Sequence, residues 1–438
     1  MKKIYLFLLA SAFYFAVNAQ IISTVAGNGT SGFSGDGGQA TSAQISGPVG
    51  IIADATGNFY IADGSNRIRK VAVNGVITTI AGTGPAAYGG DNGLATSAQL
   101  NVPAGLAFNS LGDLFIADYQ NHRIRKITMS TGIITTVAGN GTLGFSGDGA
   151  SALLAQISSP TGVCFDALDN MYIADQGNAR VRRVDNVTGF ISTIAGNGNS
   201  GHSGDGGQGT AAAVGNVYDV KCDLSGNVIF SEVYNHYIRK VTVSTGIISS
   251  ICGNGAANFF GDGGPATAAS ISAPEGITID GAGNIFIAEL NNDRIRKIDA
   301  VTTIITTVAG NGMYTASGDG GPATSAGMWP DAVTTSGTDL LIVDLNNRIR
   351  RVTNVASPLG MEESSENISA ISLFPNPASE SFSVTGISPG TLVQIVDMNG
   401  NIVFSETVNA NQPINISGFA QGTYVLVVEN KKTKLVKL

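Results

Sequence analysis

Most of this chain consists of six near-copies of one segment, and this internal repeat limits what it can fold into. The clearest copy runs from Gly132 to Val184, and the aspartate of its Gly-Asp-Gly element recurs in every copy. Successive aspartates lie 55 residues apart once and then 57 residues apart four times. A fixed period in this range is typical of solenoids and propellers, whose repeats bury their apolar faces against one another. The six aspartates are Asp36, Asp91, Asp148, Asp205, Asp262 and Asp319.

Each copy contains four short runs that are rich in β-forming residues. In the second copy these runs cover residues 103–110, 112–118, 122–128 and 132–139, and short links with turn-forming residues join them. Such links predict that consecutive runs pair antiparallel, and we name them strands a, b, c and d. Four-stranded antiparallel sheets repeated around an axis are the blades of a β-propeller.

The order of the strands indicates how the ring closes. The chain begins with an unpaired strand d at Ile21–Ala26, and its last group of strands a, b and c has no strand d after it. We therefore predict that the N-terminal strand completes the sixth blade, which leaves no half-made sheet edge. The predicted fold is all-β: a six-bladed propeller closed by an N-terminal strand over residues 20–356, then a small C-terminal β-sandwich. Strands a begin near Pro48, Pro103, Pro160, Val217, Pro274 and Pro330.

The first 19 residues have the pattern of a secretory signal peptide. Lys2 and Lys3 precede the apolar stretch Ile4–Val17, and Val17-Asn18-Ala19 is a small-residue cleavage site, so the mature chain is expected to begin at Gln20. No other long apolar stretch follows, so we expect no transmembrane segment.

Composition excludes some classes of function. The net charge of −8 argues against a nucleic-acid partner, which calls for a basic patch. Three cysteines do not make a disulfide framework. Cys164 and Cys222 occupy strand a of adjacent repeats but are offset by one position, so they are expected on opposite faces. Together with Cys252, they are interpreted as buried small hydrophobes.

The residues IADYQNHRIRK (Ile116–Lys126) resemble the NHL repeat family. Combined with TVAGNG and FSGDGG, they are especially similar to the NHL propeller of teneurins and of many bacterial secreted proteins. The resemblance covers about residues 20–356 and implies a six-bladed propeller. Because the family includes binding modules, sensors and some lyases, it leaves the function open.

The repeat ends before residues 357–370, which read as a linker. Residues 371–438 alternate as strands and turns, which suggests a small β-sandwich. Their PNP, DMNG, GTYVL and KLVKL elements resemble the C-terminal sorting domain of the type IX secretion system of Bacteroidetes. The resemblance implies that this tail engages the type IX machinery and that the protein is secreted or displayed on the outer-membrane surface. A generic β-sandwich adhesion module is the alternative.

Two rings of acidic residues are expected on one face of the propeller, where the b–c turns and the long d–a loops emerge. The Gly-Asp-Gly aspartates form the first ring and could bind calcium, or they could hold tight turns through backbone amides; no other cofactor is predicted. The acids of the b–c turns form the second ring, and we interpret them as structural partners of the arginines on strand c. These acids are Asp63, Asp118, Asp175, Glu232, Glu289 and Asp344, and the arginines are Arg69, Arg125, Arg182, Arg239, Arg296 and Arg350.

Departures from the repeat identify candidate ligand-binding residues. One loop position reads Phe33, Tyr88, Phe145, His202, Phe259 and Ala316, which indicates either packing of each loop on its blade or a stacking surface. The fourth copy departs most, and the only tryptophan precedes the last strand a. The candidates are His202, Tyr218, Asp219, Glu232, Tyr234, His236, Tyr237 and Trp329.

Three functions remain open. The first is a binding propeller that recognises an extracellular protein, peptide or glycan through its loop face. The second is a metal-dependent lyase or hydrolase at the channel mouth, which would need His202, Asp219, Glu232 and His236 to come together. The third is a structural cell-surface or adhesion component. No catalytic residue is assigned.

Overall fold

The computed structural model describes residues 20–355, 372–374, 378–385, 390–396, 402–409, 412–419, 421–428 and 431–437. The predicted signal peptide and the linker, residues 1–19 and 357–370, lie outside these residues. The chain divides into two compact units, Met1–Ala356 and Ser357–Leu438.

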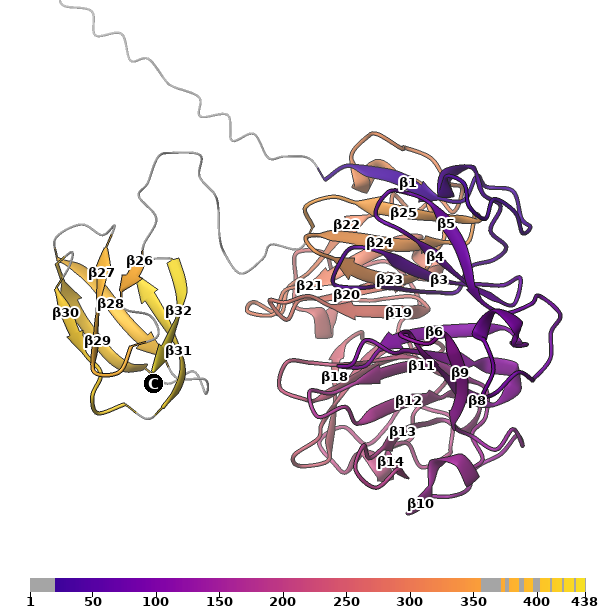
Figure 1. Ribbon diagram of the computed structural model, residues 1–438, viewed down its shortest axis with the longest axis horizontal. Helices are drawn as coiled ribbons and strands as arrows, with labels where there is room; N and C mark the ends of the chain where they lie inside the picture. The colour runs from indigo at the N-terminus through magenta and orange to yellow at the C-terminus, as the bar shows by residue number, and fades with distance from the viewer. Residues whose placement is uncertain are drawn as a thin grey trace, which may run out of the picture. The chain divides into compact units, whose positions relative to one another are not determined.

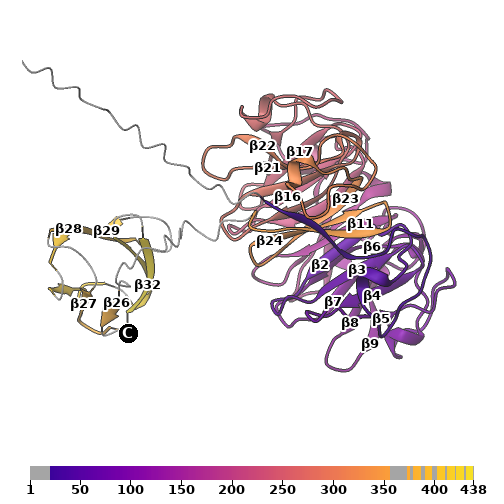
Figure 2. The same ribbon diagram turned by 90° about the horizontal axis from the view of Figure 1, so that it is seen from above.

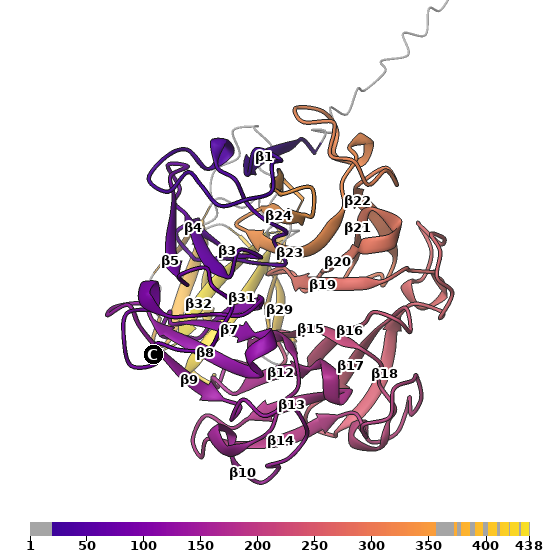
Figure 3. The same cartoon turned by 90° about the vertical axis from the view of Figure 1, so that its right-hand side faces the viewer.

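The described part of the first unit forms six antiparallel sheets, which follow one another around a ring (Figure 3). Blade 1 contains β2 (Gly50–Ala53), β3 (Phe59–Asp63), β4 (Arg67–Val71) and β5 (Ile77–Ala81). Blade 2 contains β6 (Pro103–Phe108), β7 (Leu114–Asp118), β8 (Arg123–Thr128) and β9 (Ile133–Ala138). Blade 3 contains β11 (Pro160–Phe165), β12 (Met171–Asp175), β13 (Arg180–Val184) and β14 (Phe190–Ala195), with β10 (Ala150–Ser151) added beside β14. Blade 4 contains β15 (Val217–Cys222), β16 (Val228–Glu232), β17 (Tyr237–Thr242) and β18 (Ile247–Cys252). Blade 5 contains β19 (Pro274–Ile279), β20 (Ile285–Glu289), β21 (Arg294–Ile298) and β22 (Ile305–Ala309). Blade 6 contains β23 (Pro330–Ser336), β24 (Asp339–Asp344), β25 (Arg348–Val352) and β1 (Ile22–Ala26).

The N-terminal strand closes the ring, as the repeat order predicts. Strand β1 pairs antiparallel with β25, with Ile22 opposite Val352, and becomes the outer strand of the sixth blade (Figure 1). The first and last blades lie side by side, with β2 in contact with β23 (Figures 1 and 2). Ile22 is fully buried in a cluster that also contains Phe286 of the fifth blade. The two ends of the propeller are therefore joined by backbone hydrogen bonds and by shared apolar packing.

The hydrophobic core lies between neighbouring blades. Strand b is buried along its whole length in the first five blades and beyond its first residue in the sixth, because a sheet covers each of its two faces. Tyr172 of blade 3 and Phe230 of blade 4 belong to one buried cluster, for example. Burial on both faces explains why successive residues of strand b are apolar and do not alternate with polar ones.

Short 3-10 turns shape the two kinds of connection on the loop face. The d–a loops contain η1 (Ala40–Ser42), η2 (Ala95–Ser97), η4 (Ala152–Leu154), η6 (Gly209–Ala211), η7 (Ala266–Ala268) and η9 (Ala323–Ser325), and the b–c turns contain η3 (Tyr119–Asn121), η5 (Gln176–Asn178) and η8 (Leu290–Asn292). Glycines surround Asp36 because the loop needs positive φ there: φ is +89° at Gly35, where a Cβ atom would lie 2.6 Å from that of Ala43.

Cys164 and Cys222 point to opposite faces of their own sheets, as their offset of one position predicts, and both pack in the cluster between blades 3 and 4. The sulfur atoms of Cys164 on β11 and Cys222 on β15 lie 3.3 Å apart. Adjacent blades pack face to face, so the side chains that meet come from opposite faces of their own sheets. The offset of one position therefore brings the two thiols together. Cys164 and Cys252 are buried, whereas Cys222 is partly exposed.

The described part of the second unit contains two small antiparallel sheets. One has the order β26-β27-β30 and the other β29-β28-β31-β32. Phe382, Val393, Ile414 and Leu426 contribute to one buried cluster between the sheets. The bounds are β26 (Ser372–Phe374), β27 (Ser381–Thr385), β28 (Thr391–Val396), β29 (Ile402–Val408), β30 (Pro413–Asn415), β31 (Gly422–Val428) and β32 (Lys431–Lys437).

Candidate functional site

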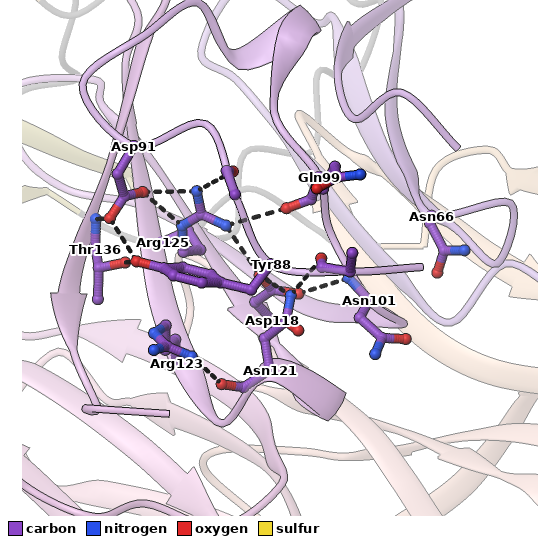
Figure 4. A network of polar contacts seen from close by, with 12 residues as sticks. Asn66, Tyr88, Asp91, Gln99, Asn101, Asp118, Asn121, Arg123, Arg125 and Thr136 are labelled. Atoms are coloured by element: carbon purple, nitrogen blue, oxygen red, sulfur yellow. Dashed lines mark hydrogen bonds and ion pairs between the residues drawn. The ribbon is translucent and has the colours of Figure 1, made fainter. Parts of the chain in front are cut away.

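A buried arginine holds two acidic residues in each blade. In the second blade the Arg125 side chain is fully buried and lies 2.6 Å from Asp91 of the incoming loop and 3.1 Å from Asp118 of the b–c turn (Figure 4). The second carboxylate oxygen of Asp91 accepts a hydrogen bond from the Thr136 backbone on β9 at 3.0 Å. The aspartate thus attaches the long loop to strands c and d of the blade that it enters.

The same arrangement recurs in all six blades. The arginine lies 2.6–2.7 Å from the loop aspartate and 3.0–3.4 Å from the b–c acid. Burial raises the pKa of Asp118, although the hydrogen bond from Asn121 and the charge of Arg125 oppose the rise. Both acid rings therefore have the structural role that the pairing hypothesis assigns to the b–c acids.

The predicted calcium candidates lie in this network. Each Gly-Asp-Gly aspartate faces the arginine of its blade, and its side chain is 24–49% exposed. Burial raises the pKa of Asp91, but hydrogen bonds and the Arg125 charge outweigh it and lower the pKa overall. No group of three or more His, Cys, Asp or Glu side chains that could hold a metal occurs among the described residues.

The aromatic loop position packs on arginine. The Phe33 ring lies under the guanidinium of Arg67 at 3.7 Å, and Tyr88, Phe145 and Phe259 repeat this contact. In blade 4 both partners change together: His202 stacks on Tyr237 at 3.7 Å with an interplanar angle of 7°. One aromatic stack therefore replaces one cation–π contact.

This exchange explains three of the candidate residues. His202 Nδ1 lies 3.3 Å from a carboxylate oxygen of Glu232, which is itself paired with Arg239 at 3.0 Å. His202, Glu232 and Tyr237 thus belong to the loop attachment of blade 4. The other two members of the proposed metal cluster have different partners: Asp219 contacts Lys221, and His236 Nδ1 accepts the Ala273 backbone N–H at 3.2 Å.

A cavity of about 420 Å³ lies at the loop-face mouth of the central channel. Its rim comes from the b–c turns and includes Tyr119, Tyr234 and Asn291, while Tyr218 and Glu275 reach it from strands a. This volume falls within the range of small-molecule sites, roughly 300–1,000 Å³. The structure therefore brings Tyr218, Tyr234 and His236 of the predicted set to one cavity, whereas Trp329 is outside its lining.

The channel wall is apolar on one side and acidic on the other. The second residue of strand a, or the equivalent position in blade 1, forms an inner ring, and its polarity changes around the propeller. The Tyr218 hydroxyl donates a hydrogen bond to Asp331 at 3.1 Å. In chain order the ring is Val49, Ala104, Thr161, Tyr218, Glu275 and Asp331.

Asp331 and Glu275 share a poorly solvated environment. Burial raises the pKa of Asp331 to about 7. Burial and the neighbouring Asp331 charge raise the pKa of Glu275 to about 10. Within the described residues, Glu275 Oε2 is buried without a hydrogen-bond partner. The pair therefore retains a proton at neutral pH and presents both a donor and acceptors beside the cavity.

A lysine neutralises the next carboxylate along the channel. Lys221 Nζ lies 2.6 Å and 2.7 Å from the two Asp219 oxygens. The position of Asp219 is occupied by glycine in four other blades, because the inner strands approach each other closely there. A Cβ atom at Gly276, for example, would lie 2.6 Å from the Ala332 Cα. Asp219 instead accepts the Ile277 backbone N–H of the neighbouring blade at 3.0 Å, so it joins strands β15 and β19.

The acid pair predicts a specific pH dependence of stability. The pKa values of Glu275 and Asp331 rise from 4.5 and 3.8 to about 10 and about 7, so the unfolded chain loses these protons at lower pH than the folded protein. Their contribution to stability is complete below about pH 4 and is lost as the pH rises through these folded values. Glu275→Gln is expected to reduce the decrease in the free energy of unfolding between pH 5 and pH 9, by on the order of 1 kcal/mol per pH unit.

Urea unfolding at several pH values measures this effect. Glu406→Gln removes the same charge from an exposed position of β29 and serves as the control. Parallel pH profiles for Glu275→Gln and the parent protein would contradict the assignment.

Sequence reasoning missed Glu275, Asp331 and Lys221. A signal was present, because the second position of strand a changes from small or apolar to acidic around the six copies. Reading it requires knowing which side chains of strand a face the channel.

Comparisons with known proteins identify both units. The family model described as Teneurin NHL domain matches residues 16–87 and 252–357, and the NHL repeat model matches residues 100–127. The model described as Secretion system C-terminal sorting domain matches residues 372–438. Among the described residues, no helix is long and apolar enough to cross a membrane.

Curated relatives match about 60% of the chain. It is 30% identical to Protein SUPPRESSOR OF QUENCHING 1, chloroplastic, of Arabidopsis thaliana over 292 residues, which is 64% of this chain and 27% of that protein. It is 27% identical to mouse Teneurin-1 over 279 residues, which is 60% of this chain and 8% of the relative. The chain thus spans about a quarter or less of the length of these two relatives.

Solved structures share the fold at low identity. A protein of unknown function from Bacteroides thetaiotaomicron has a TM-score of 0.58 and 18% identity, and the match covers 76% of each chain. An auxiliary nutrient binding protein from Bacteroides ovatus has a TM-score of 0.56 and 14% identity, again over 76% of each chain.

Proposed function

We propose, because this chain is an NHL-repeat propeller followed by a secretion system C-terminal sorting domain, that it is an exported binding protein whose ligand occupies the cavity at the channel mouth. The sorting domain implies engagement with the secretion machinery and secretion or surface attachment in a Bacteroidetes-type bacterium. The ligand is a peptide or glycan from outside the cell, and residues 371–438 contact the type IX machinery after removal of the signal peptide.

The observation that carries this proposal is the break in the repeat at the inner ring. Blades 1 to 3 place Val49, Ala104 and Thr161 at positions where blades 4 to 6 place ionisable side chains. Burying such groups costs free energy unless they are hydrogen-bonded, and a scaffold needs no asymmetry of this kind. A ligand with hydroxyl or amide groups would supply a partner for Glu275, which lines the cavity and whose Oε2 has none.

The rim and the apolar wall suit the rest of such a ligand. Tyr119 and Tyr234 lie on the rim and offer rings on which sugar or peptide groups can stack. Val49 and Ala104 provide an apolar part of the lining. The nutrient-binding description of a Bacteroides neighbour agrees with this type of function, although at 14% identity it supports the fold alone.

The experiment is a thermal-shift screen of the chain from Gln20 with a panel of mono- and disaccharides and di- and tripeptides. A ligand that binds only the folded state raises Tm, and the rise grows with the logarithm of the ratio of its concentration to Kd. We expect at least one member to do so. Glu275→Gln and Tyr218→Phe are expected to weaken its binding by about 10-fold or more, because each removes a hydrogen bond to the ligand site.

Tyr314→Phe is the matched control, because Tyr314 is exposed and is not part of the cavity lining. The proposal fails if no member of the panel binds, or if the hits bind both cavity variants as tightly as the parent protein.

The two alternatives make different demands. A metal-dependent enzyme would need His202, Asp219, Glu232 and His236 around one ion, whereas these side chains are divided between the blade 4 loop attachment, the Lys221 pair and the cavity rim. An adhesion component would self-associate or coat cells without a soluble ligand. Size-exclusion chromatography of the same chain measures the self-association.

A further inference from the structure

We propose that Cys164 and Cys222 form a disulfide bond that joins the third and fourth blades in the exported protein. The two sulfur atoms lie 3.3 Å apart and belong to β11 and β15, the neighbouring inner strands of these blades. A cysteine that serves only as a buried small hydrophobe does not need a second cysteine beside it. The third cysteine, Cys252, is fully buried on β18 and provides a comparison within the same chain.

The geometry permits a bond without rearranging the sheets. A disulfide needs a sulfur–sulfur distance of about 2.05 Å, so the two atoms must approach each other by little more than 1 Å. Rotation about the Cα–Cβ bonds of the two side chains moves the sulfurs by this amount or more. The strands that carry them already pack against each other. The bond therefore adds a covalent link where the blades are in contact.

The chemistry is thiol–disulfide exchange with a disulfide donor of the cell envelope, either a small-molecule disulfide or an oxidised thiol oxidoreductase. The partly exposed Cys222 attacks the donor as its thiolate and forms a mixed disulfide, releasing one donor thiol. The Cys164 thiolate then displaces the second donor thiol. Two protons and two electrons leave the cysteine pair, and the donor disulfide becomes two thiols.

The buried position of Cys164 indicates when the exchange occurs. Burial raises the pKa of the Cys164 thiol well above its usual value, so little thiolate is present once the blades have packed. Exchange is therefore fastest while the third and fourth blades are still assembling. Proteins that pass through an oxidising compartment, as the sorting domain implies, meet the donor at this stage.

The link lies on the inner strands that also contribute residues to the candidate cavity. Cys222 follows Lys221 on the strand that also carries Tyr218 and Asp219. The disulfide closes a loop that contains the whole outer part of blade 3 and the connection to blade 4. It would hold β15 in place against β11, the two inner strands that carry Tyr218 and Thr161 of the cavity lining.

Thiol counting tests the proposal directly. The full chain is exported to the periplasm of an expression host, purified without reductant, unfolded in guanidinium and alkylated with iodoacetamide before intact-mass analysis. We expect one alkylated cysteine without reductant and three after reduction. Peptide mapping is expected to give one crosslinked pair that contains residues 164 and 222. Three alkylated cysteines in the non-reduced protein would overturn the proposal.

Two variants and one stability measurement separate this bond from other thiol chemistry. Cys252→Ser is expected to retain the crosslink, whereas Cys222→Ser is expected to lose it. Reductant should lower the Tm of the parent protein by roughly 5 °C and leave that of Cys222→Ser unchanged. Loss of the crosslink in Cys252→Ser, or an equal effect of reductant on both proteins, would contradict the assigned pair.

Discussion

Replacing Arg182 by alanine is expected to lower the free energy of unfolding by about 3–5 kcal/mol, because it leaves Asp175 as an unpaired buried charge. Arg182 and Asp175 are both fully buried and lie 3.2 Å apart. Arg182 also attaches the incoming loop through Asp148 at 2.7 Å. Urea unfolding followed by tryptophan fluorescence and far-ultraviolet circular dichroism measures the change.

The neighbouring residue provides a matched control. Arg183 pairs with Asp185 at 2.9 Å, but both side chains are about one-third exposed. Arg183→Ala is therefore expected to cost less than about 1 kcal/mol, as is usual for exposed ion pairs. Similar losses in the two variants would show that the buried network is not what attaches the loops.

Deleting the residues before Gly27 is expected to prevent the propeller from remaining soluble and folded. The deletion removes β1, so β25 becomes an exposed edge whose backbone groups lose their partners. It also uncovers apolar side chains of blades 5 and 6 that pack around Ile22. Size-exclusion chromatography and circular dichroism of the truncated chain are expected to show aggregation or loss of cooperative unfolding.

A pair of point variants tests the same closure in a protein that still folds. Ile22→Ala is expected to cost about 2–5 kcal/mol, because it leaves a cavity in a buried cluster. Ile21→Ala changes the preceding residue, which is 37% exposed, and is expected to cost much less. A soluble, cooperative truncated chain together with a neutral Ile22→Ala variant would contradict closure by this strand.

Most of the fold could be predicted from the sequence because the sequence of one blade recurs six times. The recurrence of four strands in each copy predicted the blades, and the unpaired strand at Ile21–Ala26 predicted both closure and its location. The recurring acids and arginines likewise predicted the pairing of Asp118 with Arg125. Each of these inferences depends on local spacing or on counting strands, which a repeated sequence makes readable.

The candidate site could be predicted only in part. Departures in the fourth copy led to Tyr218, Tyr234 and His236, which line the cavity, but also to His202 and Tyr237, which stack on each other instead. Glu275 was missed, because its copy otherwise follows the repeat closely. A departure from a repeat identifies an altered contact but does not say whether the partner is a ligand or the protein's own loop.

The sequence by itself determined the number of blades, the strand that closes them and the sorting domain that follows. Only the tertiary structure decided which side chains meet across blades: Cys164 with Cys222, and Tyr218 with Asp331. The physical reason is that strand spacing and turns are set by residues near one another in the chain, whereas contacts between inner strands depend on how six twisted sheets pack around one axis. Those contacts join residues 58 and 113 positions apart.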